Sequence, residues 1–158
     1  MNTTQRRAAR GKQAMRAPGQ WDTLAPFALI LQRQPMAAGD MAAASVEVRT
    51  AWHHICNGSG TVEQLNKLVM AMNICAHRAE RIGPDAAEVA ERAQVAIASM
   101  QQRYERLSRI GPDANALAHV PLALQLYDEM LRNVSVHQLN ESMAAVEAQM
   151  FAEAANEA

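Results

Sequence analysis

Apolar side chains recur at steps of three and four residues along most of the chain, which is the spacing of one face of an α-helix. Five successive segments show this pattern, with polar or charged residues between the apolar positions. The segments are residues 40–56, 61–83, 85–110, 117–134 and 136–150. Each segment therefore predicts an amphipathic helix whose apolar face packs against its neighbours.

Two copies of the hexapeptide Arg-Ile-Gly-Pro-Asp-Ala, at residues 81–86 and 109–114, separate three of these helices. Glycine can adopt the left-handed conformation that ends a helix, and the proline after it cannot continue that helix. The aspartate can then accept hydrogen bonds from the free N–H groups that open the next helix. Three helix starts also have the spacing of a capping box: Asp85 with Glu88, Thr61 with Gln64, and Ser135 with Gln138.

Short turns between successive helices predict an all-α fold, an antiparallel up-and-down bundle of about five helices. The competing fold is a helical-hairpin solenoid, because the two hexapeptides lie 28 residues apart. We favour the bundle, since two copies are fewer than such arrays need. Pro121 interrupts the fourth apolar series, where it either kinks the helix or, as we expect, marks its first turn. The core has few aromatic residues, so a homo-oligomer such as a dimer is physically reasonable.

The chain before residue 36 has two parts. Residues 1–20 contain five basic residues and no acidic one, so we expect a flexible basic arm in front of a bundle domain of residues 21–158. The basic residues of the arm are Arg6, Arg7, Arg10, Lys12 and Arg16. Residues 21–35 are apolar but contain two prolines, which predicts a short packed segment rather than a long helix. The apolar residues that we expect to lie across the bundle are Leu24, Phe27, Ile30 and Leu31.

Charge is distributed unevenly along the chain. The formal net charge is −1, but without the five basic residues of the arm ten basic residues remain against 16 acidic ones. After Arg132 the chain has acidic residues and no lysine or arginine. Cys56 and Cys75 lie in apolar helical patterns, and no secretory signal or membrane-length apolar run occurs. We therefore expect reduced thiols in a cytoplasmic protein that has no membrane partner.

Histidine and cysteine gather on the first two predicted helices and raise the question of a zinc site: His53, His54, Cys56, Cys75 and His77. If residues 57–60 form a tight turn, Cys75 lies about 20 Å along its helix from the level of Cys56. Zinc ligands must all lie within about 2.3 Å of one point, so we expect no metal, two buried thiols, and histidines that face solvent or cap helices. No nucleotide-binding loop, nucleophile elbow or pair of catalytic carboxylates occurs in the sequence. The sequence therefore predicts no catalytic residue, no enzyme activity and no cofactor.

The basic arm is the clearest candidate for binding chemistry. Five cations without a compensating acid can neutralise phosphates and give salt-dependent affinity for nucleic acid. The alternatives are a solubilising tail, or an arm that docks on the acidic C-terminus of its own chain or a sister chain. No predicted helix is short, basic and polar enough to be a recognition helix.

Arginines gather near the ends of the second and third predicted helices: Arg78, Arg81, Arg103, Arg106 and Arg109. Cations there complement the helix dipole, and antiparallel packing puts the two groups at opposite ends of the bundle, so we expect a structural role. Ten methionines are more than packing demands. Most should fill the core, but Met70 lies off the main apolar face of its helix and is our candidate for an exposed protein contact.

A sparse set of residues carries a resemblance: Arg49-Thr50-Ala51-Trp52, Gly58, Gly60-Thr61, Leu65, Asn73, Arg103, Arg106 and Gly111. This set, together with the opening Arg-Arg-Ala-Ala-Arg-Gly-Lys, resembles short hypothetical proteins carried by proteobacterial phages, prophages and plasmids. The likeness covers roughly residues 49–146. That group has no established activity, so the resemblance carries over no catalytic or binding residue. It implies an accessory protein of a mobile element.

We therefore expect a non-enzymatic accessory or regulatory protein that binds another protein. If the resemblance holds, the partner is a host regulatory or defence component. The alternative is a DNA-associated transcriptional regulator that uses the five cations of the basic arm on phosphates.

Overall fold

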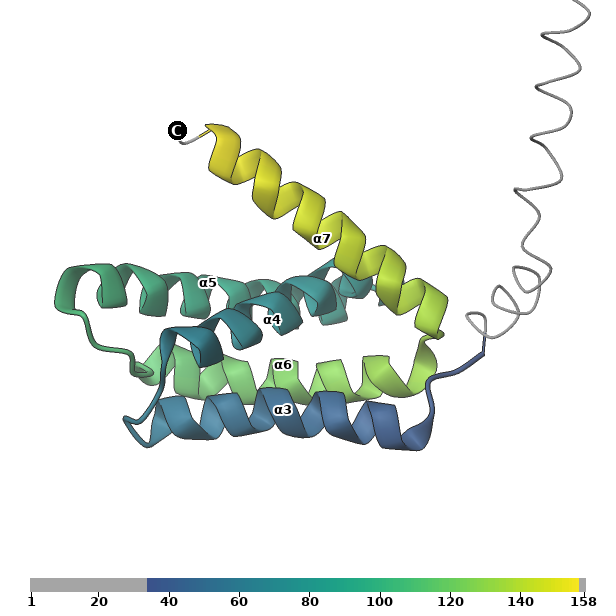
Figure 1. Ribbon diagram of the computed structural model, residues 1–158, viewed down its shortest axis with the longest axis horizontal. Coiled ribbons are helices and arrows are strands. Elements are labelled where there is room, and N and C mark those ends of the chain that lie inside the picture. Colours follow the sequence, from purple (N-terminus) through teal and green to yellow (C-terminus); the bar gives the residue numbers. More distant parts are fainter. Residues whose placement is uncertain (1–33, 157–158) are drawn as a thin grey trace, which may run out of the picture.

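The computed structural model describes residues 34–156, apart from the side chain of Glu153, so the predicted arm and residues 21–33 lie outside this range. Five α-helices follow one another in the described range (Figure 1): α3 Ala38–Cys56, α4 Val62–Ile82, α5 Pro84–Leu107, α6 Ala114–Asn133 and α7 Val136–Asn156. Residues 34–156 form no strand, only an isolated bridge between Pro35 and Ser135. The predicted all-α bundle is confirmed.

Helix α4 lies at the centre of the bundle, because it contacts each of α3, α5, α6 and α7. Helices α3 and α5 each pack on both α4 and α6, so α3–α6 form a four-helix unit. Figure 1 shows α3 and α6 as a lower layer and α4 and α5 as an upper layer. The central position explains why buried residues lie on more than one face of α4: Leu65, Leu68, Ala71, Met72, Ile74, Cys75 and Ala79.

The core combines a few large side chains with many alanines. Ile55, Leu68, Met100 and Leu124 are at most 2% exposed. The fully buried alanines come from α4, α5 and α6: Ala79, Ala93, Ala96, Ala116 and Ala123. Small side chains at these positions let the helix backbones approach closely and keep the interior densely packed without aromatic rings.

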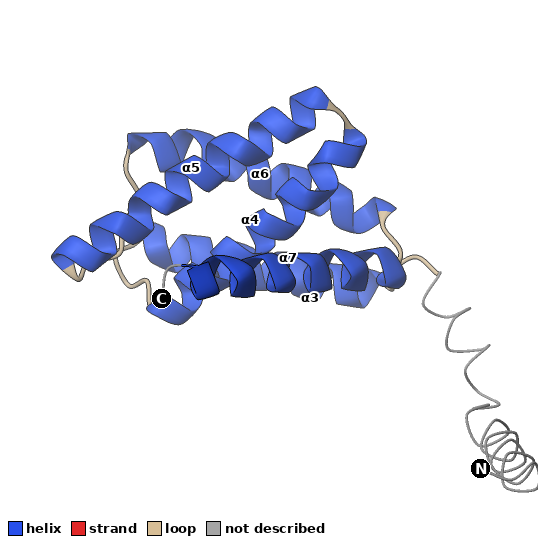
Figure 2. Cartoon of the chain, turned by 90° about the horizontal axis from the view of Figure 1, so that it is seen from above, coloured by secondary structure: helices blue, strands red, loops and turns tan. Residues whose placement is uncertain are grey.

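Helix α7 is attached to the rest of the bundle on one side only. It contacts α4 and makes no comparable approach to the other described helices. Its buried side chains are Ser142, at 0% exposure, and Val146, at 4%. Beyond Val146 every side chain of α7 that the structure describes is exposed. In Figure 2 α7 overlies α3 along one edge of the bundle, and in Figure 1 its C-terminal half points away from α5.

The two copies of the repeated hexapeptide form different turns. In the first copy Gly83, with φ of 150°, is the single residue between α4 and α5, and Pro84 is the first residue of α5. Proline is favoured as the first residue of a helix because it has no N–H to leave unpaired. No side chain caps the start of α5. The capping box predicted for Asp85 and Glu88 is therefore wrong, since Asp85 already lies inside the first turn.

The second copy follows a helix that ends earlier than its sequence predicts. Helix α5 ends at Leu107, and Ser108 adopts the left-handed conformation with φ of 50°, so Gly111 does not end the helix. Asp113 caps α6 as predicted and accepts a hydrogen bond from the Ala116 N–H at 2.8 Å. This hydrogen bond lowers the pKa of Asp113.

The other two capping boxes are confirmed. Thr61 and Gln64 exchange side-chain to backbone hydrogen bonds of 2.9 and 3.3 Å at the start of α4. Ser135 and Gln138 exchange bonds of 2.9 and 3.2 Å at the start of α7. Pro121, in contrast, lies inside α6 rather than in its first turn, because Asp113 starts the helix upstream of it.

Candidate functional site

A groove runs between the overhanging half of α7 and the surface formed by α4 and α5. It consists of two adjoining hollows with volumes of about 390 and 290 Å³, and Asn73, Gln94 and Met150 line both of them. The other lining residues come from three helices: Val69, Met72, Ala76, His77, Glu80, Ile97, Ala98, Gln101, Val146 and Gln149. We call this feature the α7 groove. It exists because α7 packs on the bundle through Ser142 and Val146 and then leaves the bundle surface (Figure 1).

The floor of the α7 groove is polar. The side-chain amide of Gln94 donates a hydrogen bond to the side-chain oxygen of Asn73 at 2.9 Å, which links α5 to α4. His77 Nδ1 is buried and has no hydrogen-bond partner within residues 34–156. Glu80 adds an exposed carboxylate at the same wall. A buried nitrogen without a partner is a site where a ligand's hydrogen-bonding group would be stabilising.

The α7 wall of the groove has two apolar side chains and one polar one, Gln149. Val146 and Met150 line the groove, and Met150 is 39% exposed. Met143 and Phe151, on the same helix, are 37% and 75% exposed. Methionine side chains fit irregular surfaces, and a cluster of exposed large apolar side chains on a monomer marks an interaction surface.

Helix α7 remains helical beyond its packing contacts because of its composition. From residue 144 onward it is rich in alanine, which has the highest helix propensity: Ala144, Ala145, Ala148, Ala152, Ala154 and Ala155. The helix has no lysine or arginine. Glu141 pairs with Arg81 of α4 at 3.6 Å, and Glu147 is exposed on the next turn. Glu80 in the groove wall and Glu147, next to Val146, supply carboxylates that can pair with a basic ligand, and Arg78 and Arg81 lie beside Glu80 on α4.

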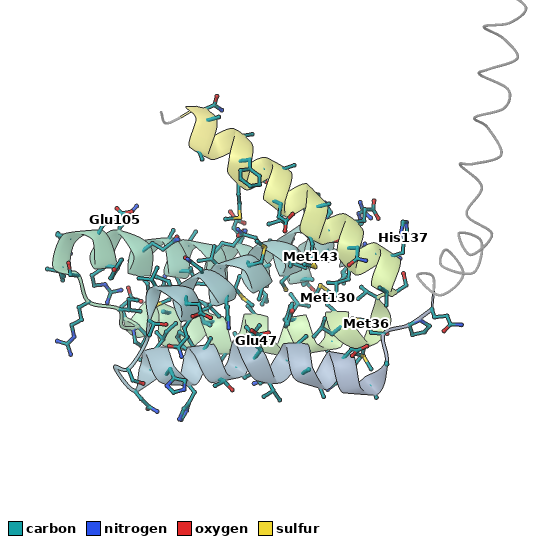
Figure 3. The ribbon with its side chains drawn as sticks, in the orientation of Figure 1. Met36, Glu47, Glu105, Met130, His137 and Met143 are labelled. Atoms are coloured by element: carbon teal, nitrogen blue, oxygen red, sulfur yellow. The ribbon has the colours of Figure 1, made fainter. Side chains whose placement is uncertain are left out.

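Three methionines lie where α7 begins. Figure 3 shows Met36, Met130 and Met143 near the end of the molecule at which the chain enters α3. Met130 is 3% exposed, and Met36 packs against the core from the segment before α3. The entry to α3 and the end of α6 therefore both contribute methionine side chains to the core, whereas Met143 stays exposed on α7.

Met70, the protein contact that the sequence indicated, lies on α4 outside the α7 groove. It is half-buried and packs against the core. The five cations of the predicted basic arm, Arg6 to Arg16, lie outside the described residues. The groove residues that sequence reasoning missed are Asn73, His77, Gln94 and Met150. Phe151 beside Met150 was the available signal, because it is a large apolar residue off the predicted apolar face of the last helix.

Two sequence predictions are wrong here: Cys56 is exposed rather than buried, and His77 is half-buried rather than facing solvent. Cys56 is the last residue of α3 and is exposed, whereas Cys75 is 1% exposed in the middle of α4. His53 and His54 contact Asn57 and Ser59 at 2.8 and 3.0 Å in the turn after α3. Within residues 34–156 no three residues of metal-binding type come together.

The two thiols should differ strongly in reactivity. Burial raises the pKa of Cys75 to about 12, so almost none of it is thiolate at neutral pH. We expect a thiol reagent to modify Cys56 rapidly in the folded protein and Cys75 only after denaturation. The measurement is a time course of thiol modification with and without denaturant, and Cys56→Ser should abolish the fast phase. Equal rates for both thiols in the folded protein would contradict the burial of Cys75.

The arginines at the end of α5 do more than complement a helix dipole. Arg103 binds the carboxylate of Asp113 at 2.9 Å and so connects α5 to the start of α6. Arg103 and Arg109 also line a hollow of about 350 Å³ with Cys56, because the α3–α4 turn and the α5–α6 loop lie at one end of the bundle. The Arg103–Asp113 pair is a structural contact, and the hollow shows no buried polar group without a partner. The α7 groove is therefore the stronger candidate.

Comparisons of this chain with protein-family models, with curated proteins and with solved structures found no match. No helix within residues 34–156 has the length and apolar character needed to span a lipid bilayer.

Proposed function

We propose that this protein is a non-enzymatic accessory protein that binds another protein through the α7 groove. The observation that carries the proposal is that Met150 lines the groove and Phe151 follows it in sequence, both exposed on the half of α7 that the bundle does not cover. Exposed methionine and phenylalanine beside polar groups with spare hydrogen-bonding capacity are typical of surfaces that receive a peptide segment.

The chemistry of the groove defines the segment that it fits. Val146 and Met150 offer apolar contacts, Asn73 and His77 offer hydrogen bonds, and Glu80 and Glu147 lie around them. The segment should therefore have large apolar side chains and basic flanks. The resemblance to proteins of phages and plasmids supports a host regulatory or defence protein as its source.

The test is an affinity pull-down from bacterial lysate with the tagged full chain, treated with nuclease. The wild type should retain a specific partner, and Met150→Glu should retain at least about tenfold less of it. A factor of ten in affinity requires about 1.4 kcal/mol, and a carboxylate buried in the interface costs more than that. The matched control is Ala148→Glu, which adds the same charge on the same helix. Ala148 lies roughly opposite Val146 and Met150 at about 100° per residue.

If Met150→Glu and Ala148→Glu retain equal amounts of the partner, the groove is not the binding site. The alternative function is a DNA-associated regulator, which rests on the cations Arg6, Arg7, Arg10, Lys12 and Arg16. It predicts that only nucleic acid co-purifies, that nuclease removes it, and that glutamine at all five positions abolishes its retention.

A further inference from the structure

The chain enters the described structure beside the first turn of α7. The Val136 N–H donates a hydrogen bond to the Gln34 carbonyl at 3.3 Å, and Pro35 pairs with Ser135. These contacts fix residue 34 next to the start of the helix that forms one wall of the α7 groove (Figure 3). Whatever precedes residue 34 therefore joins the described structure about 15 Å, measured along α7, from Val146, the first α7 residue that lines the groove.

Residues 21–33 have the chemistry that the groove fits. Their large apolar side chains include one of the two tryptophans and one of the two phenylalanines of the chain: Trp21, Leu24, Phe27, Ile30 and Leu31. The five cations of residues 6–16 lie immediately upstream, and the second half of α7 has acidic residues without a basic one. An apolar stretch of this size requires cover from water, and Val69, Ala98 and Met150 give the groove apolar surface within reach of its point of attachment.

The length of residues 21–33 suits the distance to be covered. Met150 lies about 21 Å along α7 from Val136 at ~1.5 Å per helical residue. The segment spans about 20 Å as a helix and up to roughly 43 Å when extended. As an extended chain it reaches the whole length of the groove along α7, and as a helix it ends just short of the level of Met150. A short tether also raises the effective concentration of a segment at its site to the millimolar range, so modest intrinsic affinity suffices for docking.

We propose that residues 21–33 occupy the α7 groove of their own chain. The docking itself does not depend on the function proposed above. The regulatory consequence does rest on it, because an external partner must then displace the segment before it can bind. A second copy of the chain, exchanging the same segment between two bundles, is the competing occupant.

Crosslinking in the purified full chain tests the proposal without any partner. In a Cys56→Ser background, Thr23→Cys is combined either with Ala98→Cys, an exposed groove residue, or with Ala148→Cys, on the far side of α7. Ala148 lies only about 18 Å along α7 from Val136, so an undocked tether reaches it as well. A short bis-maleimide should join Thr23→Cys to Ala98→Cys within one chain at least about fivefold faster than to Ala148→Cys.

Each other outcome overturns docking within the chain. Equal rates for the two pairs would show a tether that does not dock, and a crosslinked dimer would show a second copy as the occupant. Tryptophan fluorescence supplies a readout that needs no new thiol. In Trp52→Phe, Trp21 is the remaining tryptophan, and Met150→Glu should shift its emission to longer wavelength while Ala148→Glu should not.

The two proposals fail in different ways. If crosslinking favours Ala98→Cys but no partner binds in the pull-down, the docked segment stands and the proposed function falls. If a partner depends on Met150 but crosslinking shows no preference, the function stands and the docking falls. If both hold, Phe27→Ser, which weakens the competing segment, should increase partner retention about threefold or more.

Discussion

Replacing Leu68 with alanine should lower the free energy of unfolding by about 2 to 5 kcal/mol. Leu68 is 0% exposed and lies on α4, the helix that contacts each of the other four described helices. Removing its side chain loses apolar burial and leaves a cavity. Because α4 is held on several sides, no single helix can move inward to fill that cavity without losing its contacts elsewhere.

Urea denaturation followed by circular dichroism measures this change. The matched control is Leu117→Ala on α6, where the leucine is 53% exposed and the same atoms are removed. We expect it to cost less than about 1 kcal/mol, since little apolar area returns to water. Similar losses for the two variants would contradict the central position of α4.

The features that the sequence predicted correctly are those that depend on contacts within about four residues. Thr61 with Gln64 and Ser135 with Gln138 form their capping boxes because donor and acceptor lie on the same turn, whatever the rest of the chain does. The errors at Asp85 and Pro121 have a similar local origin. In each case two residues compete to start a helix, Pro84 with Asp85 and Asp113 with Pro121, and the sequence pattern does not rank them.

The α7 groove could not be predicted because it depends on how helices are placed relative to one another. Asn73 and Gln94 are polar residues on two helices, and each would suit a solvent-facing position. Their hydrogen bond exists only because α4 and α5 pack in one particular register. Likewise, the sequence pattern of α7 extends to Met150 as though the helix packed along its whole length. Its exposure after Val146 depends on the direction in which α7 leaves α4, which the sequence pattern does not encode.

The same placement explains the contacts at the opposite end of the bundle. The sequence assigned Arg103 to the dipole of its own helix, but α5 ends at Leu107 and the following loop returns Asp113 to within 2.9 Å of the guanidinium. Arg103 and Asp113 are ten residues apart in sequence, so they pair only because of the path of the loop between them. The repeated hexapeptide does not encode that path. The two hexapeptides give different turns for the same reason.

Replacing Val146 with aspartate should release α7 from the bundle and leave α3–α6 folded. Val146 is 4% exposed, and a carboxylate at this position without a partner costs several kcal/mol. Helix α7 touches α4 alone among the described helices, so separating it loses less burial than unfolding the whole bundle does. The protein should therefore avoid the buried charge by local undocking, which is how weakly attached elements open.

Hydrogen exchange resolved by segment measures this release. Amides of residues 136–156 should exchange on the order of 100-fold faster in Val146→Asp, corresponding to roughly 3 kcal/mol of lost protection, while those of α4 and α6 change little. The control Ala148→Asp adds the same charge to an exposed position on α7 and should leave exchange nearly unchanged. Faster exchange throughout the chain would instead make α7 an integral part of one cooperative unit. Without α7 the groove loses one of its walls. In Val146→Asp, Met150→Glu should therefore no longer reduce partner binding, and the crosslinking preference for Ala98→Cys should disappear. Both proposals thus depend on α7.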